Sequence, residues 1–403
     1  MGLGTEGYSP ALLVKIEYAG ANAPSFGQAA KALDKLAELP ISPKHVQRLT
    51  ERLGTERAVQ RDREVKLRQA GGLQPQHAQP PAVAVIHVDA GKLQLRAEDG
   101  QPGVRHPHWS DTKVACLQTY AAAPGGDDPQ PQPPAAFLDP PAVVRLCQEI
   151  AQVRSDPATR PTAPPVERKG QRGQSDHRRV CLIRTAVATT QPVEEFGWMV
   201  AAEATRRGFY QAPRRALIGD GGNWIEPLGR GHFTGWTMVL DFVHLLTHLH
   251  AAAMAAYRGQ ARQAWALYER LLRAAWAGQV QHVQSNLQAQ LRRLGPPPDN
   301  APDDTPSRIV AKVLAYVTAN AGRMDYPSYR RNGLPVGSAA VESLIKQFNQ
   351  RVKGTEKFWL RGGAEAVLQI RAAYLSDDGR GEAFHANRPR SRAAGGGRLK
   401  AVA

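Results

Sequence analysis

Three carboxylates stand out by their position in the sequence pattern. Asp89 follows a continuous apolar run from Ala82 to Val88, which is typical of a strand buried on both faces. Asp220 ends a second predicted strand over 214–220, and Glu342 lies in the first turn of a predicted helix over 338–352. Because acids at the ends of neighbouring strands can converge on one point, we expect Asp89, Asp220 and Glu342 to share a site.

Three carboxylates at one point repel one another unless cations bridge them. Two Mg²⁺ ions, with Mn²⁺ as a substitute, suit carboxylate ligands together with phosphate oxygens of a substrate. For each acid taken alone, a structural role is the commoner one. An Asp at a strand end is usually a turn former or helix cap, and Glu342 can pair with Lys346 one turn further on.

Basic side chains follow Glu342 along the same predicted helix. Lys346 and Lys353 recur at helical spacing on the stripe that carries Glu342, and Arg351 and Lys357 lie close by in the sequence. We expect these four cations to contact phosphate groups, and a solvated helix face is the alternative. A metal-binding acid followed by phosphate-binding cations is an arrangement that suits an enzyme of nucleic acids.

Several stretches of the chain match, in order, a known group of proteins. They are His87–Gly91, Ile218–Ile225, Leu240–His244, Tyr329–Ser338, Val341–Gly354 and Phe358–Trp359. On these stretches the chain resembles the DDE transposases of bacterial insertion sequences, in particular the ISKra-like group. In that group an RNase H-like catalytic domain is interrupted by an all-α insertion. The likeness covers roughly residues 40–375, and its most specific part surrounds Glu342.

The resemblance implies that Asp89, Asp220 and Glu342 are both the catalytic residues and the metal ligands. It also implies a D-x-x-H element, which falls on Asp241 and His244. His244 then either approaches the active site or orients a strand end, and the alternative is that the two side chains only pair with each other in packing. Two Trp residues, Trp224 and Trp359, are candidates for stacking on exposed DNA bases, although a core position is the commoner role for Trp.

Composition favours a polyanionic partner. The chain has 403 residues, with 52 Lys and Arg against 36 Asp and Glu, which gives a net charge of +16. Residues 1–25 lack periodicity and are expected to be loosely held. A helix then begins at Gly27, and Ser42 and Pro43 start a second one. With Arg48 and Arg52 on the second helix, the pair resembles a DNA-binding helix-turn-helix, and an ordinary helical hairpin is the alternative.

The order of predicted elements indicates an α/β fold: an RNase H-like domain with a mixed sheet, interrupted by helices. We expect a helical N-terminal region at 1–72 and the first part of the catalytic domain at 80–228, with a Pro-rich or disordered insert at 121–178. An all-α insertion follows at 230–330, with helices expected near 236–257, 259–277, 280–294 and 306–320. The C-terminal part of the catalytic domain is expected at 331–376, and a disordered basic tail at 377–403.

The expected function is that of a DNA transposase, which cleaves transposon ends and joins the 3′-hydroxyl to target DNA. The expected partners are DNA and further copies of the chain, as a homodimer or higher oligomer, with no membrane and a cytoplasmic, nucleoid-associated location. The alternatives are a degenerate or domesticated transposase that only binds DNA, and an RNase H-like nuclease without strand transfer. Relatives carry a cysteine-bearing N-terminal module that this sequence lacks, which leaves room for an inactive, truncated copy.

Overall fold

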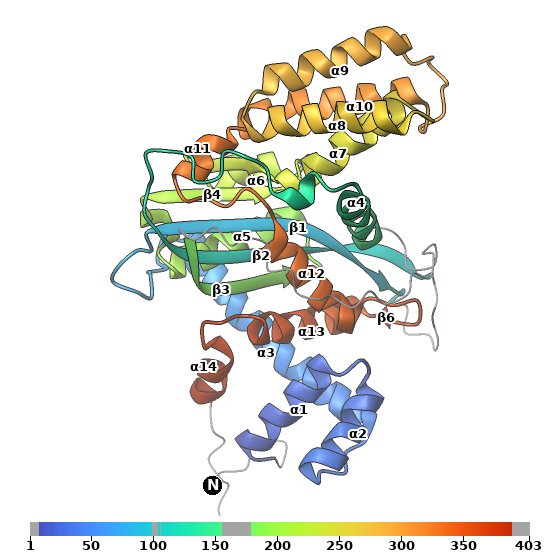
Figure 1. Cartoon of the computed structure of the whole chain (residues 1–403). Helices are drawn as coiled ribbons and strands as arrows, with labels where there is room; N and C mark the ends of the chain where they lie inside the picture. Colours follow the sequence, from blue (N-terminus) through green and yellow to red (C-terminus); the bar gives the residue numbers. More distant parts are fainter. Residues whose placement is uncertain (1–7, 99–103, 105, 155–178, 389–403) are drawn as a thin grey trace, which may run out of the picture.

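A mixed β-sheet lies at the centre of the molecule (Figure 1). The computed structural model describes residues 8–98, 104, 106–154 and 179–388. Within them the strands are β1 (Val83–Leu95), β2 (His108–Ala122), β3 (Arg179–Thr189), β4 (Arg214–Gly219), β5 (Thr237–Leu240) and β6 (Phe358–Trp359). Their order is β3-β2-β1-β4-β5, and β6 pairs with the end of β1. The expected α/β class with a mixed sheet is therefore confirmed.

Strand β1 is the centre of this sheet. It runs antiparallel to β2 and parallel to β4 and β6. The predicted strand ends at Asp89, but β1 continues to Leu95 because β2 pairs with it along its whole length. Only the pairing with β4 stops earlier, at His87. Asp89 is therefore an interior residue of β1 that lies just beyond the parallel part of its pairing.

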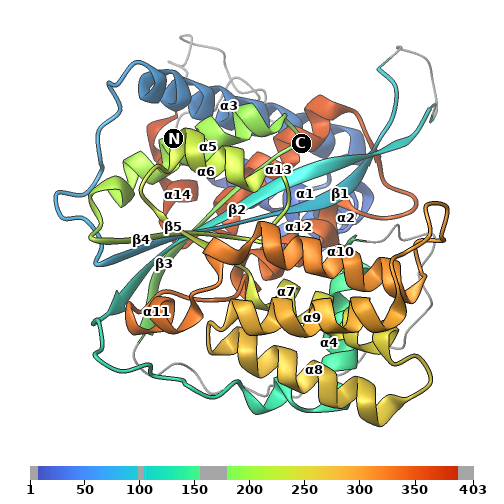
Figure 2. The same ribbon diagram turned by 90° about the horizontal axis from the view of Figure 1, so that it is seen from above.

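Helices cover both faces of the sheet (Figure 2). Even-numbered residues of β1, such as Ile86 and Val88, pack with α5 (Val193–Arg206) and α6 (Ile225–His232). Odd-numbered residues face the other side, where Leu93 and Leu95 pack with α12 (Ala339–Val352) and α13 (Arg361–Tyr374). The alternation of strand side chains thus assigns Asp89 to the face that α12 covers.

A block of helices stands beside the sheet between β5 and α12, at the top of Figure 1. It contains α7 (Phe242–Ala256), α8 (Ala261–Trp276), α9 (Val280–Leu294), α10 (Pro306–Ala319) and α11 (Tyr326–Arg331). Its apolar side chains form one core with residues of β1, β4 and β5. A helix was expected over 236–257, but 237–240 form strand β5 because they pair with β4. Helix α7 starts only after Asp241, its N-cap.

The N-terminal helices pack on the far side of α13. They are α1 (Pro10–Asn22), α2 (Phe26–Ala37) and α3 (Pro43–Gln69). The expectation that residues 1–25 are loosely held is wrong for α1, because Ser9 caps this helix and Leu13 and Ile16 are buried. Helix α3 has 27 residues, so it is longer than the short second helix expected for a helix-turn-helix.

Two segments that were expected to be disordered are ordered in part. In the Pro-rich stretch after β2, Asp128 pairs with Arg330, and Trp276 Nε1 donates to the carbonyl of Gln130 at 2.9 Å. This stretch leads through a short 3₁₀ turn (Ala135–Phe137) to α4 (Pro140–Arg154), and 155–178 lie outside the described residues. In the expected tail, α14 (Arg380–Asn387) is held by Arg380, which pairs with Glu203.

None of the helices in the described part of the chain is long and apolar enough to cross a membrane.

Candidate metal centre

Asp89 lies in β1 two residues beyond its last pair with β4, and Asp220 directly follows β4. The register pairs Val83 with Arg214 and His87 with Ile218, and continued by two residues it would set Asp89 opposite Asp220. Asp89 is buried and Asp220 is half-buried. Parallel strands deliver their carboxyl ends to one edge of a sheet, where ligands of open α/β sheets commonly bind. Continued in this way, the register would bring two of the three predicted acids to the same level of the sheet.

Helix α12 carries Glu342 across the same face of β1. The contact is close at Gly91, where an added Cβ would lie 3.3 Å from Ile345 Cγ2 and 3.6 Å from Asn349 Oδ1. Glu342 lies in the first turn of α12, as the sequence predicts. The apolar stripe of Val341, Ile345 and Phe348 is buried against the sheet, and this packing fixes the helix that presents Glu342.

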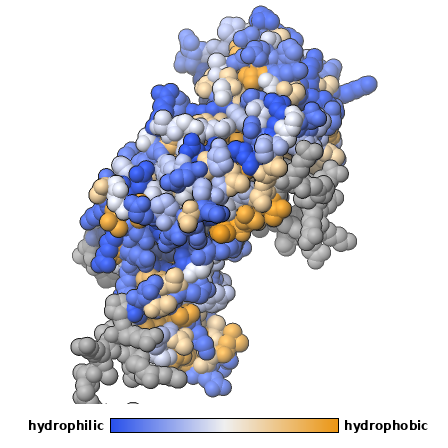
Figure 3. All heavy atoms as spheres, turned by 90° about the vertical axis from the view of Figure 1, so that its left-hand side faces the viewer, coloured by the Kyte–Doolittle hydropathy of each residue, from blue (hydrophilic) through white to orange (hydrophobic). Residues whose placement is uncertain are grey.

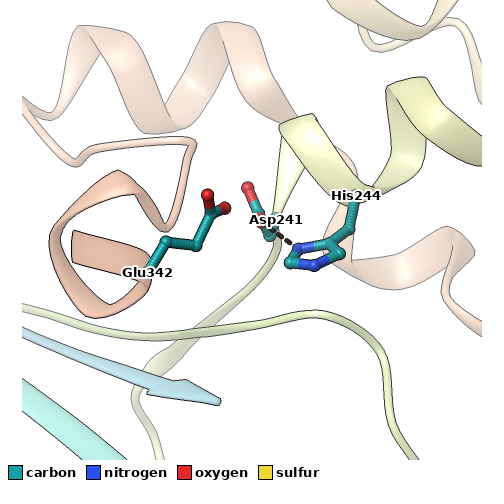
Figure 4. A group of neighbouring side chains, drawn as sticks. All are labelled: Asp241, His244 and Glu342. Carbon is teal, nitrogen blue, oxygen red and sulfur yellow. Dashed lines mark hydrogen bonds and ion pairs between the residues drawn. The ribbon is translucent and has the colours of Figure 1, made fainter. Parts of the chain in front are cut away.

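The side chain of Glu342 points toward Asp241 and His244 (Figure 4). In the described part of the chain these three residues form the only group of metal-ligand side chains whose ligand atoms all lie within 4.8 Å of one another. The expected close convergence of Asp89, Asp220 and Glu342 is therefore not present in the side-chain arrangement. Each acid makes a local contact instead: Asp89 Oδ1 accepts from the Ala90 N–H, Asp220 Oδ1 accepts from the Gly222 N–H, and Glu342 Oε1 lies 3.0 Å from the Ser338 hydroxyl.

Asp241 is fully buried and saturated by protein donors. Its Oδ1 accepts from the N–H groups of Val243 at 3.0 Å and Ser338 at 3.1 Å. Its Oδ2 accepts from His244 Nδ1 and from the Ser338 hydroxyl. A carboxylate has about four acceptor positions, so these donors occupy all of them when the Ser338 hydroxyl proton points to Asp241, and three of them when it points to Glu342. Asp241 thus pairs with His244 and holds neighbouring backbone in place, and His244 also lies within 4.8 Å of Glu342, so both roles considered for the D-x-x-H element stay open.

The electrostatics of the two acids differ. Burial alone would raise the pKa of Asp241, but the hydrogen bonds from His244 and Ser338 outweigh it and hold that pKa below its ordinary value. Burial, together with the negative charge of Asp241, raises the pKa of Glu342 above its ordinary value. A group that resists ionisation beside a fixed negative charge is one that a bound cation stabilises in its ionised form.

The chemistry of the donor set fits Mg²⁺ better at Asp89, Asp220 and Glu342 than at the Asp241 group. All three predicted ligands offer carboxylate oxygen, which is the donor that Mg²⁺ prefers. The Asp241 group contains an imidazole, and its central carboxylate is already filled. The residues at the strand ends therefore fit the implied ions, with Glu342 common to both groups.

The predicted phosphate contacts beside Glu342 differ in their exposure. Lys346 is half-buried, and its Nζ pairs with Glu149 Oε2 of α4 at 3.0 Å. Lys357 is also half-buried, and its Nζ donates to the carbonyl of Gln350 at 2.9 Å. Both ammonium groups are held by weak, partly solvated contacts that a phosphate group can replace, so their contact with DNA stays a prediction.

Arg351 and Lys353 contradict the expected phosphate contact. Arg351 is 2% exposed, its guanidinium lies over the rings of Phe26 and Trp359, and its Nε donates to the carbonyl of Gly20. Burial and a neighbouring cation lower the pKa of Arg351 to about 10. Lys353 is 8% exposed, with its Nζ over the ring of Trp109. Both cations therefore join the N-terminal helices and the β1–β2 hairpin to α12.

The predicted DNA contacts of the N-terminal region lie on α3. Arg48 is exposed, with Nη2 2.6 Å from His45 Nδ1. Arg52 is half-buried and its Nε lies 3.7 Å from Glu56 Oε1, one turn further on. Arg48 is accessible to a polyanion, whereas Nε and Nη2 of Arg52 are buried, and contact of both residues with DNA stays a prediction.

The two Trp residues pack into the protein. Trp224 is half-buried and lies edge-on to Phe196, with ring centroids 6.1 Å apart. Trp359 is buried, and its Nε1 donates to the carbonyl of Val352 at 2.9 Å. Both placements agree with the commoner core role rather than with base stacking.

The sequence analysis named Asp241 but missed its place in the fold. Asp241 follows the apolar Met238–Leu240 and precedes a helix, a pattern that signals both a strand end and an N-cap. The role of Ser338 was missed altogether. The local sequence around Ser338 does not indicate its hydrogen bond to Asp241, because the two residues are 97 positions apart.

Comparison with protein-family models gives no match for this chain, and comparison with curated proteins gives none either.

Proposed function

We propose that the protein is a DDE transposase that uses divalent ions to cleave and join DNA at Asp89, Asp220 and Glu342. The observation that supports the proposal is the parallel register of β1 and β4, which continued by two residues would bring Asp89 level with Asp220, on the sheet face that the helix of Glu342 covers. We also propose that the sheet and its covering helices are the RNase H-like domain, and that α7–α11 are its all-α insertion.

The proposed chemistry is transfer of a phosphoryl group between oxygens of DNA. Divalent ions bound to these carboxylates supply activation of a water or a DNA 3′-hydroxyl and charge stabilisation at the leaving oxygen. The protein contributes rigid alignment: β1 and β4 fix the two Asp backbones, and packing of α12 on Gly91 fixes the third acid. Gly221, with a φ of +81°, lets the backbone turn away directly after Asp220.

Positive charge supports DNA as the substrate. The net charge of +16 attracts a polyanion, and Arg48 is exposed while Arg52, Lys346 and Lys357 are half-buried. We propose that these four residues contact DNA phosphates and that the enzyme acts as a homodimer or higher oligomer on DNA.

The test is an assay with labelled transposon-end DNA taken from the flanks of the gene, a target plasmid, and Mg²⁺ or Mn²⁺. A joined product supports the transposase. Cleavage without joining supports a nuclease, and binding without cleavage supports a DNA-binding protein, so either of these results contradicts the proposal.

Substitution of the acids adds a site-specific prediction. Asp89→Asn, Asp220→Asn and Glu342→Gln should each lower the cleavage rate by at least about a hundredfold and leave DNA binding unchanged, because each removes charge stabilisation and alignment at the reacting phosphate. Glu269→Gln is the matched control, since Glu269 is an exposed acid on α8 paired with Arg273. A variant at any of the three positions with full activity would exclude that residue from the site.

A further inference from the structure

Ser338 lies at the point where the chain returns from the helical block to α12. It is 1% exposed and directly precedes α12, the helix that carries Glu342. Its hydroxyl lies within hydrogen-bonding distance of two carboxylates, Asp241 Oδ2 and Glu342 Oε1, the second at 3.0 Å, and it donates its single proton to one of them at a time. Ser338 is therefore the direct link between the buried Asp241 and the proposed metal ligand.

The hydroxyl of Ser338 does not take the usual role of a Ser at this position. A Ser at a helix N-cap normally accepts a hydrogen bond from a backbone N–H in the first turn of its own helix. Ser338 makes no such bond with its side chain, although its carbonyl accepts from the N–H of Glu342 at 3.1 Å. The side chain is turned instead toward the two acids.

Asp241 fixes Ser338 from the other end of the helical block. It accepts from both the N–H and the hydroxyl of Ser338, across 97 positions of sequence. Next to it, the N–H of Phe242 donates to the carbonyl of Val336 at 2.8 Å, so the two ends of the block are joined by backbone as well. Because Asp241 is buried and saturated, this anchor is rigid.

We propose that Ser338 is a positioning residue that holds the carboxylate of Glu342 in the orientation required for binding a divalent ion. The proposal rests on the proposed function, in which Glu342 is a metal ligand. Asp241 and His244 act through Ser338, so the base of the helical block determines where Glu342 points. Hydrogen bonds of this kind to metal-binding carboxylates typically change metal affinity by about 10–100-fold.

The test compares Ser338→Ala with Ser338→Thr in the full-length protein. Mn²⁺ affinity is measured from the electron paramagnetic resonance signal of free Mn²⁺, with Glu342→Gln defining the signal of the proposed site. The unfolding temperature of each variant is measured as well, and a crystal structure of Ser338→Ala shows the position of the Glu342 carboxylate. Ser343→Ala is the matched control, because Ser343 is an exposed serine of α12 whose hydroxyl accepts a hydrogen bond from Gln347 Nε2 at 3.3 Å.

We expect Ser338→Ala to bind Mn²⁺ at least about tenfold more weakly, with a displaced Glu342 carboxylate, and Ser338→Thr to restore most of the affinity because it keeps the hydroxyl. A merely structural role would lower the unfolding temperature and leave Mn²⁺ affinity of the folded protein unchanged, which would overturn the proposal. If the wild-type protein binds no Mn²⁺, the proposed function fails. The crystal structure then decides alone: a displaced carboxylate supports positioning by Ser338, and an unmoved one refutes it.

Discussion

Buried carboxylates serve two different roles in this protein. Asp241 and Glu17 are enclosed by donors of the protein itself, which stabilise each of them as an ionised carboxylate. Glu342 is half-buried beside a fixed negative charge, and its pKa is raised by burial and by Asp241. The first kind of acid stabilises the fold, and the second kind has reason to accept a cation.

Glu17 provides a prediction at this scale. It is fully buried on α1, its Oε1 lies 2.8 Å from Arg57 Nε of α3, and its Oε2 contacts His385 of α14. Burial raises its pKa, but the hydrogen bond from His385 and the charge of Arg57 outweigh burial and leave it lowered. The contribution of Glu17 to stability is therefore fully present above about pH 4.3, the ordinary pKa, and is lost as the pH falls through the lower folded value.

Glu17→Gln should lower the free energy of unfolding at pH 7 by about 3–5 kcal/mol, because it leaves Arg57 buried without its partner. The variant should also lose less stability than the wild type between pH 5 and the acid limit. Urea unfolding at several pH values measures both effects. Parallel pH curves for the two proteins would show that Glu17 does not carry the acid sensitivity assigned to it.

Among the elements, α3 and α13 approach each other closely at a glycine, Gly54. A Cβ on Gly54 would lie 2.2 Å from the carbonyl oxygen of Ala366, and this backbone atom has no freedom to move aside. The contact joins the N-terminal helices to the helix that packs on the sheet. Gly54 is therefore required for the two helices to approach.

Gly54→Ala should lower the free energy of unfolding by about 1–3 kcal/mol or more, since overpacking forces the helices apart. Gly72→Ala is the control, because its added Cβ would meet nothing closer than 3.8 Å. Thermal or urea unfolding of both variants provides the comparison. Equal stability of Gly54→Ala and the wild type would mean that α3 and α13 do not pack this closely.

The elements that the sequence predicted well are those with a complete local pattern. Strand β1 has a continuous apolar run, and α12 has an apolar stripe at helical spacing. Helix α1 was missed because its buried positions include Glu17 and Gly20, which read as polar or flexible until their partners in α3 are known. Strand β5 was missed because its four residues adjoin a long helical pattern, and only the pairing with β4 makes them a strand.

At the scale of the whole molecule, the site depends on contacts between distant parts of the chain. The positions of Asp89, Asp220 and Glu342 followed from local patterns, but the saturation of Asp241 by Ser338 did not, because 97 positions separate them. For the same reason Arg351 was predicted to face DNA, whereas Phe26 from the N-terminal helices buries it. The face in Figure 3 is largely hydrophilic with small apolar patches.

The most direct test of the account is the position of Mn²⁺ in crystals of the full-length protein, located from anomalous scattering. The account predicts anomalous peaks within about 2.5 Å of carboxylate oxygens of Asp89, Asp220 and Glu342, with Asp241 still bonded to His244 and Ser338. A peak held by Asp241, His244 and Glu342, with none at Asp89 and Asp220, would contradict it.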